Sequence, residues 1–221
     1  MKLAALTIGQ SSRTDIMADI EQIFIKNTKI IEKGALNGLS KKEINDLYPK
    51  ENDYILISRL SDGTSAKISG SYVEKKLQSI IKEMEDEVDI FLILCAGQFS
   101  DLTSKKLIIK PDVLLNKLIP GIVKSGIMVD LVPLKEQIEE LKTRWTFTNI
   151  TVKYKSLCPY TATRGEIISK AREIRDMKPD LVLLDCFGFG TDTKKVFKEI
   201  VDKPIILVRT LFAYILKELL E

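Results

Sequence analysis

Short apolar runs alternate along this sequence with longer stretches in which apolar residues recur every three or four positions. A continuous apolar run predicts a strand buried on both faces, and the longer spacing predicts a helix with one apolar face. The first expected helix, from about Thr14, carries Ile16, Ile20, Ile23 and Phe24 on such a face. Strands are expected at 3–8, 29–36, 89–95, 107–109, 126–132, 152–157, 180–186 and 204–208. With roughly four strand–helix units on each side of about residue 100, the pattern predicts one or two three-layer α/β sheets.

Several local signals refine this pattern. Ser61-Asp-Gly-Thr64 is a good hairpin turn between apolar runs at 54–60 and 66–69, so it predicts an antiparallel insertion. Capping boxes at 40–43, 71–74 and 163–166 each predict the start of a helix. Pro120 lies inside the helix expected from Pro111 and predicts a kink or a break. Residues 135–145 have the spacing of one further amphipathic helix.

The charges are balanced and interleaved. The chain has 34 basic and 31 acidic residues and a net charge of +3, which predicts a solvated surface and no nucleic-acid or membrane-surface partner. No run approaches the ~18 apolar residues of a membrane span, and the N-terminus is typical of a first strand instead of a signal peptide. Three cysteines without regular spacing do not form a disulfide framework. We therefore expect a reduced, cytoplasmic chain.

The sequence contains no histidine. This excludes Ser-His-Asp and Cys-His nucleophiles, a histidine metal ligand and a histidine general base. Three scattered cysteines without histidine argue against a zinc site. Gly188-Phe-Gly190 follows a strand, but Thr193 stands where a dinucleotide loop has its third glycine. We expect neither a metal nor a cofactor.

One motif occurs twice. Asp89 is followed by five residues, Cys95, any residue and Gly97, and Asp180 stands at the same distance from Cys186 and Gly188. In parallel α/β sheets, ligands bind at the carboxyl ends of the strands, where both thiols are expected. The alternative is that the cysteines are packed in the core and inert, since cysteine is among the most buried residue types.

Two thiols have a definite use in catalysis. Isomerisation at a carbon beside a carboxylate needs a base on one face and an acid on the other. A thiol serves only if its pKa falls towards neutrality, which nearby positive charge or helix N-termini favour. Both cysteines precede expected helix starts. Alternation along the strand places Asp185 on the face opposite Cys186. Cys158 also ends an expected strand and is a weaker third candidate.

The loop after the first strand is a candidate carboxylate site. Backbone N–H groups before a helix attract anions, and Arg13 would add a bidentate donor. The alternative is a capped helix start with a solvent-facing Arg13. Phe99 and Phe187 follow the duplicated cysteines and would supply an apolar wall, which favours an aryl or alkyl substituent over an ammonium group.

Several short motifs, in this order along the chain, resemble the AroM family. They are Leu6–Gln10, Gly34–Ser40, Arg59–Gly63, Cys95-x-Gly97, Pro159-Tyr160 and Asp185-Cys186-x-Gly188. AroM proteins are distantly similar to the aspartate/glutamate racemase superfamily, which includes hydantoin racemase, maleate isomerase and arylmalonate decarboxylase. The resemblance covers nearly the whole chain.

That resemblance implies two flavodoxin-like three-layer (αβα) lobes related by a pseudo-dyad, with a cleft between them. The first lobe would comprise residues 1–98 plus 205–221, with the hairpin insertion near 54–69, and the second residues 99–204. The catalytic cysteines would be Cys95 and Cys186, and the carboxylate loop would be Gln10–Arg13. Ala96 and Phe187 replace the usual Asn-Thr and Thr after the two cysteines, which argues against recognition of an amino group.

Two classes of function follow. The first is a cofactor-independent isomerase, racemase or decarboxylase of a small carboxylate, and the second is a non-catalytic carboxylate-binding protein. In the first, Cys95 and Cys186 are the acid/base pair. The expected substrate-binding residues are Gln10, Ser11, Arg13, Gly97, Gln98, Phe99, Cys158, Tyr160, Phe187 and Gly188. The apolar stretch at 211–216 would serve a homodimer or the core.

Overall fold

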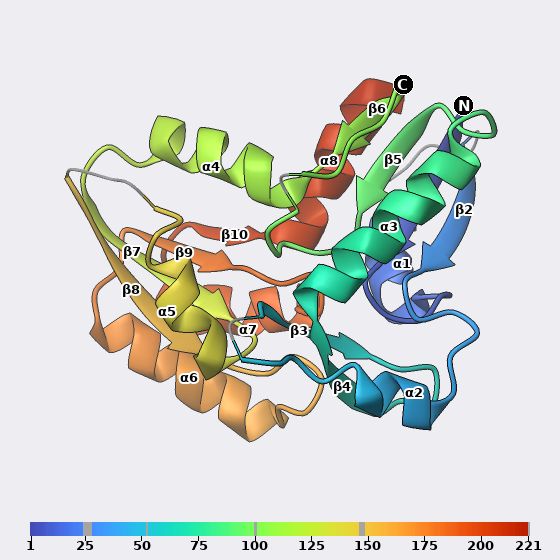
Figure 1. Ribbon diagram of the computed structural model, residues 1–221. Helices are drawn as coiled ribbons and strands as arrows, with labels where there is room; N and C mark the ends of the chain where they lie inside the picture. The colour runs from blue at the N-terminus through green and yellow to red at the C-terminus, as the bar shows by residue number, and fades with distance from the viewer. Residues whose placement is uncertain (24–27, 52, 100, 146–148, 221) are drawn as a thin grey trace. The chain divides into compact units, whose positions relative to one another are not determined.

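The computed structural model describes residues 1–221 except 24–27, 52, 100, 146–148 and 221. The chain forms two compact α/β units, residues 1–113 with 213–221 and residues 114–212 (Figure 1). Phe24, expected on the apolar face of the first helix, lies outside the described residues.

The first unit contains a four-stranded parallel sheet in the order β2-β1-β5-β6. Its central strands β1 and β5 are buried, as their sequence predicts, whereas the edge strands β2 and β6 are partly exposed. Residues Ala4, Leu6, Phe91 and Ile93 form one cluster with the apolar face of α3. The strands are β1 (Lys2–Thr7), β2 (Lys29–Gly34), β5 (Ile90–Ile93) and β6 (Leu107–Ile109), and the helices include α1 (Thr14–Glu21), α2 (Lys41–Asp46) and α3 (Gly70–Met84).

The hairpin insertion is confirmed, with β3 (Ile55–Arg59) antiparallel to β4 (Ser65–Ser69). The capping box of α2 is also confirmed, because Ser40 and Glu43 bond each other's backbone. The predicted box at 71–74 is wrong: α3 begins at Gly70, and Ser69 accepts the N–H of Tyr72. The hydroxyls of Ser69 and Ser71 both bind the carboxylate of Asp53, so the cap forms two residues earlier than the sequence indicates.

The second unit contains a four-stranded parallel sheet in the order β10-β9-β7-β8. Residues Val129, Leu131, Val182 and Leu184 pack on one face with residues of α6 and α7. The predicted capping box of α6, Thr163 with Glu166, is confirmed. The elements are β7 (Gly126–Val132), β8 (Ile150–Ser156), β9 (Leu181–Leu184), β10 (Ile205–Leu207), α6 (Arg164–Asp176) and α7 (Thr191–Val201).

Strand pairing corrects the division of the chain expected from the sequence. The strand at 107–109, assigned there to the second lobe, pairs with β5 of the first sheet. The strand at 204–208, assigned to the first lobe, pairs with β9 of the second sheet. The two linking helices, α4 (Pro111–Ile122) and α8 (Val208–Leu220), therefore each follow the last strand of a sheet.

Two helical segments also differ from expectation. Residues 135–145 form a short 3-10 turn (Lys135–Gln137) and the single-turn α5 (Ile138–Leu141). The chain then leaves the helix to bring Arg144 and Trp145 into buried polar contacts. The predicted break at Pro120 is wrong, because α4 continues to Ile122, and a proline removes only one hydrogen bond of the ladder.

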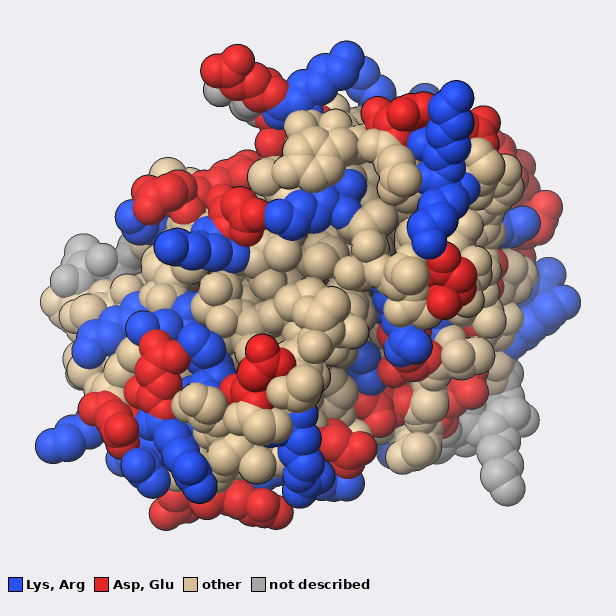
Figure 2. Space-filling view, turned by 90° about the horizontal axis from the view of Figure 1, so that it is seen from below, with Lys and Arg blue, Asp and Glu red and all other residues tan. Residues whose placement is uncertain are grey.

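The charges, the lengths of the helices and the exposure of the closing helix describe the surface of the protein. The face in Figure 2 shows Lys and Arg mixed with Asp and Glu, as the interleaved sequence predicts. Within the described ranges, every helix falls short of the length and apolarity needed to cross a membrane. In the 211–216 segment Phe212, Ala213 and Leu216 are buried and Tyr214 is exposed, and a homodimer through α8 stays a prediction.

The two sheets repeat one design. In each, the first strand lies between the second and the third, and the fourth strand adds beyond the third. Leu94 N–H donates to Leu6 O at 2.8 Å, and Asp185 N–H donates to Leu131 O at 2.9 Å, at equivalent places just before each cysteine. The duplicated cysteine motif is therefore the third strand of each sheet and the turn that follows it.

Candidate functional site

Both duplicated cysteines lie in the same local geometry. The N–H of Gly97 donates to Cys95 Sγ at 3.3 Å, and the N–H of Gly188 donates to Cys186 Sγ at 3.3 Å. A hydrogen bond to sulfur stabilises the thiolate more than the thiol. Both side chains are partly exposed, and none of the three cysteines is in a disulfide. Each turn is thus built so that a thiolate is accommodated at the end of its strand.

The glycine of each motif is required by close packing. A Cβ on Gly97 would lie 2.9 Å from Leu56 Cδ2, on the hairpin. A Cβ on Gly188 would lie 2.6 Å from Pro159 Cγ and 2.8 Å from the ring of Tyr160. Since real Cβ atoms do not approach so closely, both turns need glycine. The loop carrying Cys158, Pro159 and Tyr160 therefore packs directly on the Cys186 turn.

The acidic residue that opens each motif has a structural role. Asp89 accepts the N–H of Lys2 at 2.7 Å, and Asp180 accepts the N–H of Ile127 at 2.8 Å. Each carboxylate fixes the start of the neighbouring first strand. Neither is at the thiol end of its sheet.

A charged residue at the start of a helix forms hydrogen bonds with the backbone of each loop that follows a duplicated cysteine. Asp112, the second residue of α4, accepts the N–H of Phe99 at 3.2 Å. Arg209, the second residue of α8, donates to Phe187 O through Nε at 2.8 Å and Nη2 at 2.6 Å, and to Gly188 O at 3.3 Å. Both side chains are buried. Neither residue is predicted from the sequence, where the available signal is a charge in the first turn of an otherwise apolar helix.

The two phenylalanines after the cysteines lie in the interior. Phe99 and Phe187 are each 1% exposed, and Phe187 stacks on Phe212 with ring centroids 6.2 Å apart. Their burial fixes the turns. Gln98, between Gly97 and Phe99, is exposed.

The guanidinium of Arg13 is used inside the first unit. It makes a bidentate pair with Asp15, both distances being 2.8 Å, and Nη1 donates to Ser58 Oγ at 3.1 Å. Its side chain is buried, so the alternative of a solvent-facing cap is wrong, whereas its role as a ligand donor stays a prediction. Ser11 is similarly engaged, since its N–H donates to Asn37 Oδ1 at 2.8 Å and its Oγ accepts from Asn37 Nδ2 at 2.7 Å.

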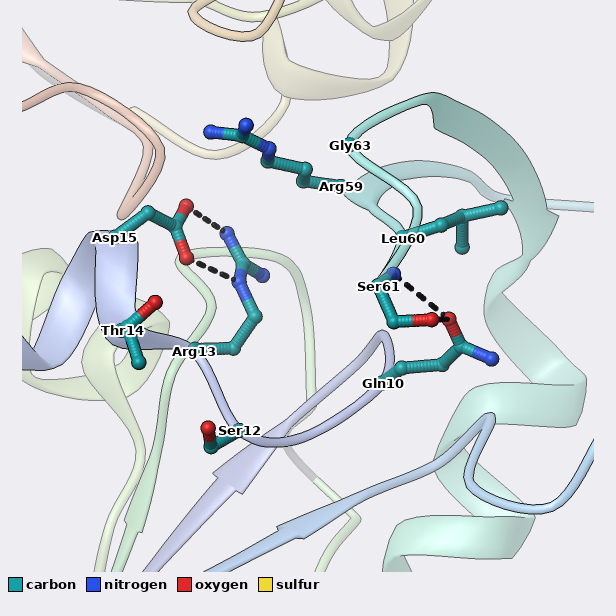
Figure 3. Close-up of a pocket in the computed structure, with 9 residues that line it drawn as sticks. All are labelled: Gln10, Ser12, Arg13, Thr14, Asp15, Arg59, Leu60, Ser61 and Gly63. Carbon is teal, nitrogen blue, oxygen red and sulfur yellow. Dashed lines mark hydrogen bonds and ion pairs between the residues drawn. The ribbon is translucent and has the colours of Figure 1, made fainter.

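A polar pocket of about 300 Å³ lies above this loop in the first unit (Figure 3). Gln10 Oε1 accepts from the N–H and Oγ of Ser61 at 2.9 and 2.8 Å, which fixes the hairpin to the loop. In Figure 3 the side chain of Arg59, from the hairpin, extends away from Arg13, whereas the side chain of Arg13 points towards Asp15. In the described part of the chain Arg59 forms no ion pair with an acidic side chain. The lining residues are Gln10, Ser12, Arg13, Thr14, Asp15, Arg59, Leu60, Ser61 and Gly63.

The second unit contains a buried polar cluster next to Cys186. Asp130 accepts the indole N–H of Trp145 at 2.8 Å, and Asp185 forms an ion pair with Arg144. Arg144 also lies over the Trp145 ring, 4.6 Å from its centroid. Burial, and then the charge of Asp185, raise the pKa of Asp130 to about 8 against the opposing effect of Arg144. Burial, followed by the charge of Asp130, also raises the pKa of Tyr154.

Among the residues described, no three or more Cys, Asp or Glu side chains are grouped so that they could hold a metal ion.

Comparison with known proteins agrees with this architecture. The family model described as AroM protein matches residues 3–220. Allantoin racemase from Pseudomonas fluorescens has a similar structure, with a TM-score of 0.61, 12% identity, and coverage of 99% of this chain and 90% of that one. Maleate isomerase from Pseudomonas putida gives a TM-score of 0.61 at 11% identity, covering 100% and 93% of the two chains.

Arylmalonate decarboxylase gives a TM-score of 0.58 at 12% identity, covering 99% of this chain and 92% of that one. No curated protein matches the sequence. At such identities the likeness establishes the two-lobed α/β fold alone.

Proposed function

This chain belongs to the AroM family, and from that premise we propose that it is a cofactor-independent isomerase, racemase or decarboxylase of a small carboxylate. Cys95 and Cys186 are the proposed acid/base pair. The observation that carries the proposal is the repeated turn in which a glycine N–H donates to the cysteine sulfur. An inert packed cysteine needs no such donor, and here the donor occurs twice at equivalent places.

In the proposed racemisation or isomerisation, one thiolate removes a proton from the carbon beside the substrate carboxylate. In the proposed decarboxylation, that carbon instead loses CO2 and keeps the electron pair of the broken C–C bond. The other thiol delivers a proton to that carbon. The chain has no histidine to perform either step. The similar solved structures include a racemase, an isomerase and a decarboxylase by name, which supports this range of reactions.

We propose that the substrate carboxylate binds in the pocket of the first unit. Arg59 supplies the charge there, and the hydroxyls of Ser12 and Thr14 supply neutral donors. Arg13 and Ser11 contribute by holding the loop, since their polar atoms are engaged within the protein. The other proposed substrate contacts are Gln10, Gly97, Gln98, Cys158, Tyr160 and Gly188, whereas Phe99 and Phe187 support the turns from the core.

One observation favours the second function, a non-catalytic carboxylate-binding protein. All nine residues that line the pocket belong to the first unit, and neither duplicated cysteine is among them. A protein that had kept only ligand binding would need this pocket and ordinary thiols.

Thiol reactivity separates the two functions. The rate of iodoacetamide labelling of each cysteine is measured against pH by peptide mass spectrometry, with and without small dicarboxylates. Fast labelling of Cys95 and Cys186 near neutral pH, blocked by a ligand, is expected for the enzyme. Labelling of both only near the ordinary thiol value of about 8.5 would contradict the acid/base pair and leave the binding protein.

A further inference from the structure

We infer that Asp130 and Asp185 share a single proton beneath the Cys186 turn, and that this buried pair makes the position of Cys186 sensitive to pH. The inference concerns the buried acids beneath the turn that carries Cys186. It rests on the proposed function only because that function gives Cys186 a catalytic role. The proton sharing itself does not depend on any reaction.

The repeat within the chain shows that the fold does not need these acids. In the second sheet, Asp130 of β7 pairs with Leu183 of β9. At the equivalent place in the first sheet, Ala5 of β1 pairs with Leu92 of β5. The residue before Cys186 is Asp185, and the residue before Cys95 is Leu94. Ala5 and Leu94 are both buried. One sheet thus fills these two positions with apolar side chains and the other with two carboxyl groups.

The charges of this cluster do not balance among the described residues. Asp130, Asp185 and Arg144 are buried, so two carboxyl groups face one guanidinium. The buried Arg209 donates instead to the backbone carbonyls of Phe187 and Gly188. Arg144 Nη1 is committed to Asp185, and its Nε donates to Asn116 Oδ1 at 3.2 Å. An isolated carboxylate in such surroundings is strongly unfavourable. A proton on one of the two acids removes the excess charge.

Asp130 is the acid that the surroundings favour as the proton holder. Its Oδ2 accepts from Trp145, whereas its Oδ1 has no hydrogen-bond partner among the described residues. Among the described residues, the charged and titratable groups that act on it are Asp185 from the end of β9, Arg144 from the segment after α5 and Tyr154 from β8. Of these three, only Arg144 is positive, and it is already paired with Asp185.

The cluster is mechanically connected to the thiol. Asp185 immediately precedes Cys186, and its N–H continues the ladder to Leu131 O. On the other face of the strand, Cys186 packs with the apolar cluster of α6 and α7. Arg144 ties Asp185 to Asn116 of α4 and to Trp145. A second negative charge on Asp130 would repel Asp185 and disturb the segment that carries Cys186.

The single tryptophan of the chain makes the proton observable. Trp145 donates directly to Asp130, so its fluorescence is expected to change when Asp130 ionises. We would titrate the protein from about pH 5.5 to 9.5, a range that lies above the ordinary pKa of a carboxyl group and ends below the ordinary tyrosine value. The wild type is expected to show a transition with a midpoint within about one unit of pH 8, and Asp130→Asn is expected to abolish it. Asp176→Asn, the same change at an exposed site of α6, is the matched control and should keep the transition.

The effect on the turn is measured as the ratio of Cys186 to Cys95 labelling, because Cys95 has the same turn without buried acids. This ratio should change several-fold across the tryptophan transition in the wild type and stay constant in Asp130→Asn. A wild-type titration without a transition in this range would overturn the proton sharing, even if the variant failed to fold. A transition with a constant ratio would overturn the connection to Cys186. Neither readout needs turnover, so loss of the proposed function would be seen separately, as absent activity with the transition intact.

Discussion

At the scale of single residues, the glycine after each cysteine decides how closely the turn can pack. Gly188→Ala would put a methyl group against Pro159 and the Tyr160 ring, and we expect the protein to lose about 1–3 kcal/mol of stability, typical of overpacking. Denaturant unfolding measures the loss. Gly165→Ala, within α6 and with only Thr163 Oγ1 near, is the control and should stabilise by about 0.5–1 kcal/mol. Equal effects at the two sites would contradict the packing argument.

A second prediction at this scale concerns Asp130 and stability. Its pKa is raised to about 8 in the folded protein, against about 3.9 in an unfolded chain. Between these values the folded state holds a proton that the unfolded state has released, so the stability gained from this group falls as pH rises through this window. Asp130→Asn is therefore expected to lose less stability than wild type between about pH 5 and 8. Urea midpoints at several pH values measure this, and parallel curves for the two proteins would contradict it.

At the scale of elements, the β3–β4 hairpin carries the charge of the pocket. Arg59→Gln is expected to weaken binding of a small carboxylate by about 10–100-fold, the loss of a charged hydrogen bond, with little change in stability. Arg13→Gln should instead destabilise the fold, because it removes the buried ion pair with Asp15 and the guanidinium hydrogen bond to Ser58. Calorimetry with small mono- and dicarboxylates and thermal unfolding distinguish the two outcomes. Arg172→Gln, an exposed site on α6, controls for net charge; unchanged affinity in Arg59→Gln would refute this assignment.

At the scale of the whole molecule, the order of the elements was predictable and the division between units was not. Apolar runs and caps are local signals, which is why β1, the hairpin and the Cys-x-Gly turns agree with expectation. Strand order is set by long-range pairing, so β6 and β10 were assigned to the wrong sheets. The same limit explains the buried acids. Alternation placed Asp185 away from the thiol face, but its partner Asp130 becomes visible only when β7 lies beside β9.

The proposed reaction needs one thiol from each unit, and this gives a prediction for the molecule as a whole. If Cys95 and Cys186 act in one reaction, replacing either by Ala should reduce turnover of the substrate to near background. Replacing both should be hardly worse, because residues that act as a unit are strongly non-additive. Asp176→Asn, an exposed change on α6 outside the proposed site, is the control and should keep most activity. Losses for Cys95→Ala and Cys186→Ala that multiplied in the double variant would mean that the two thiols act independently, and the acid/base pair would then have to be abandoned.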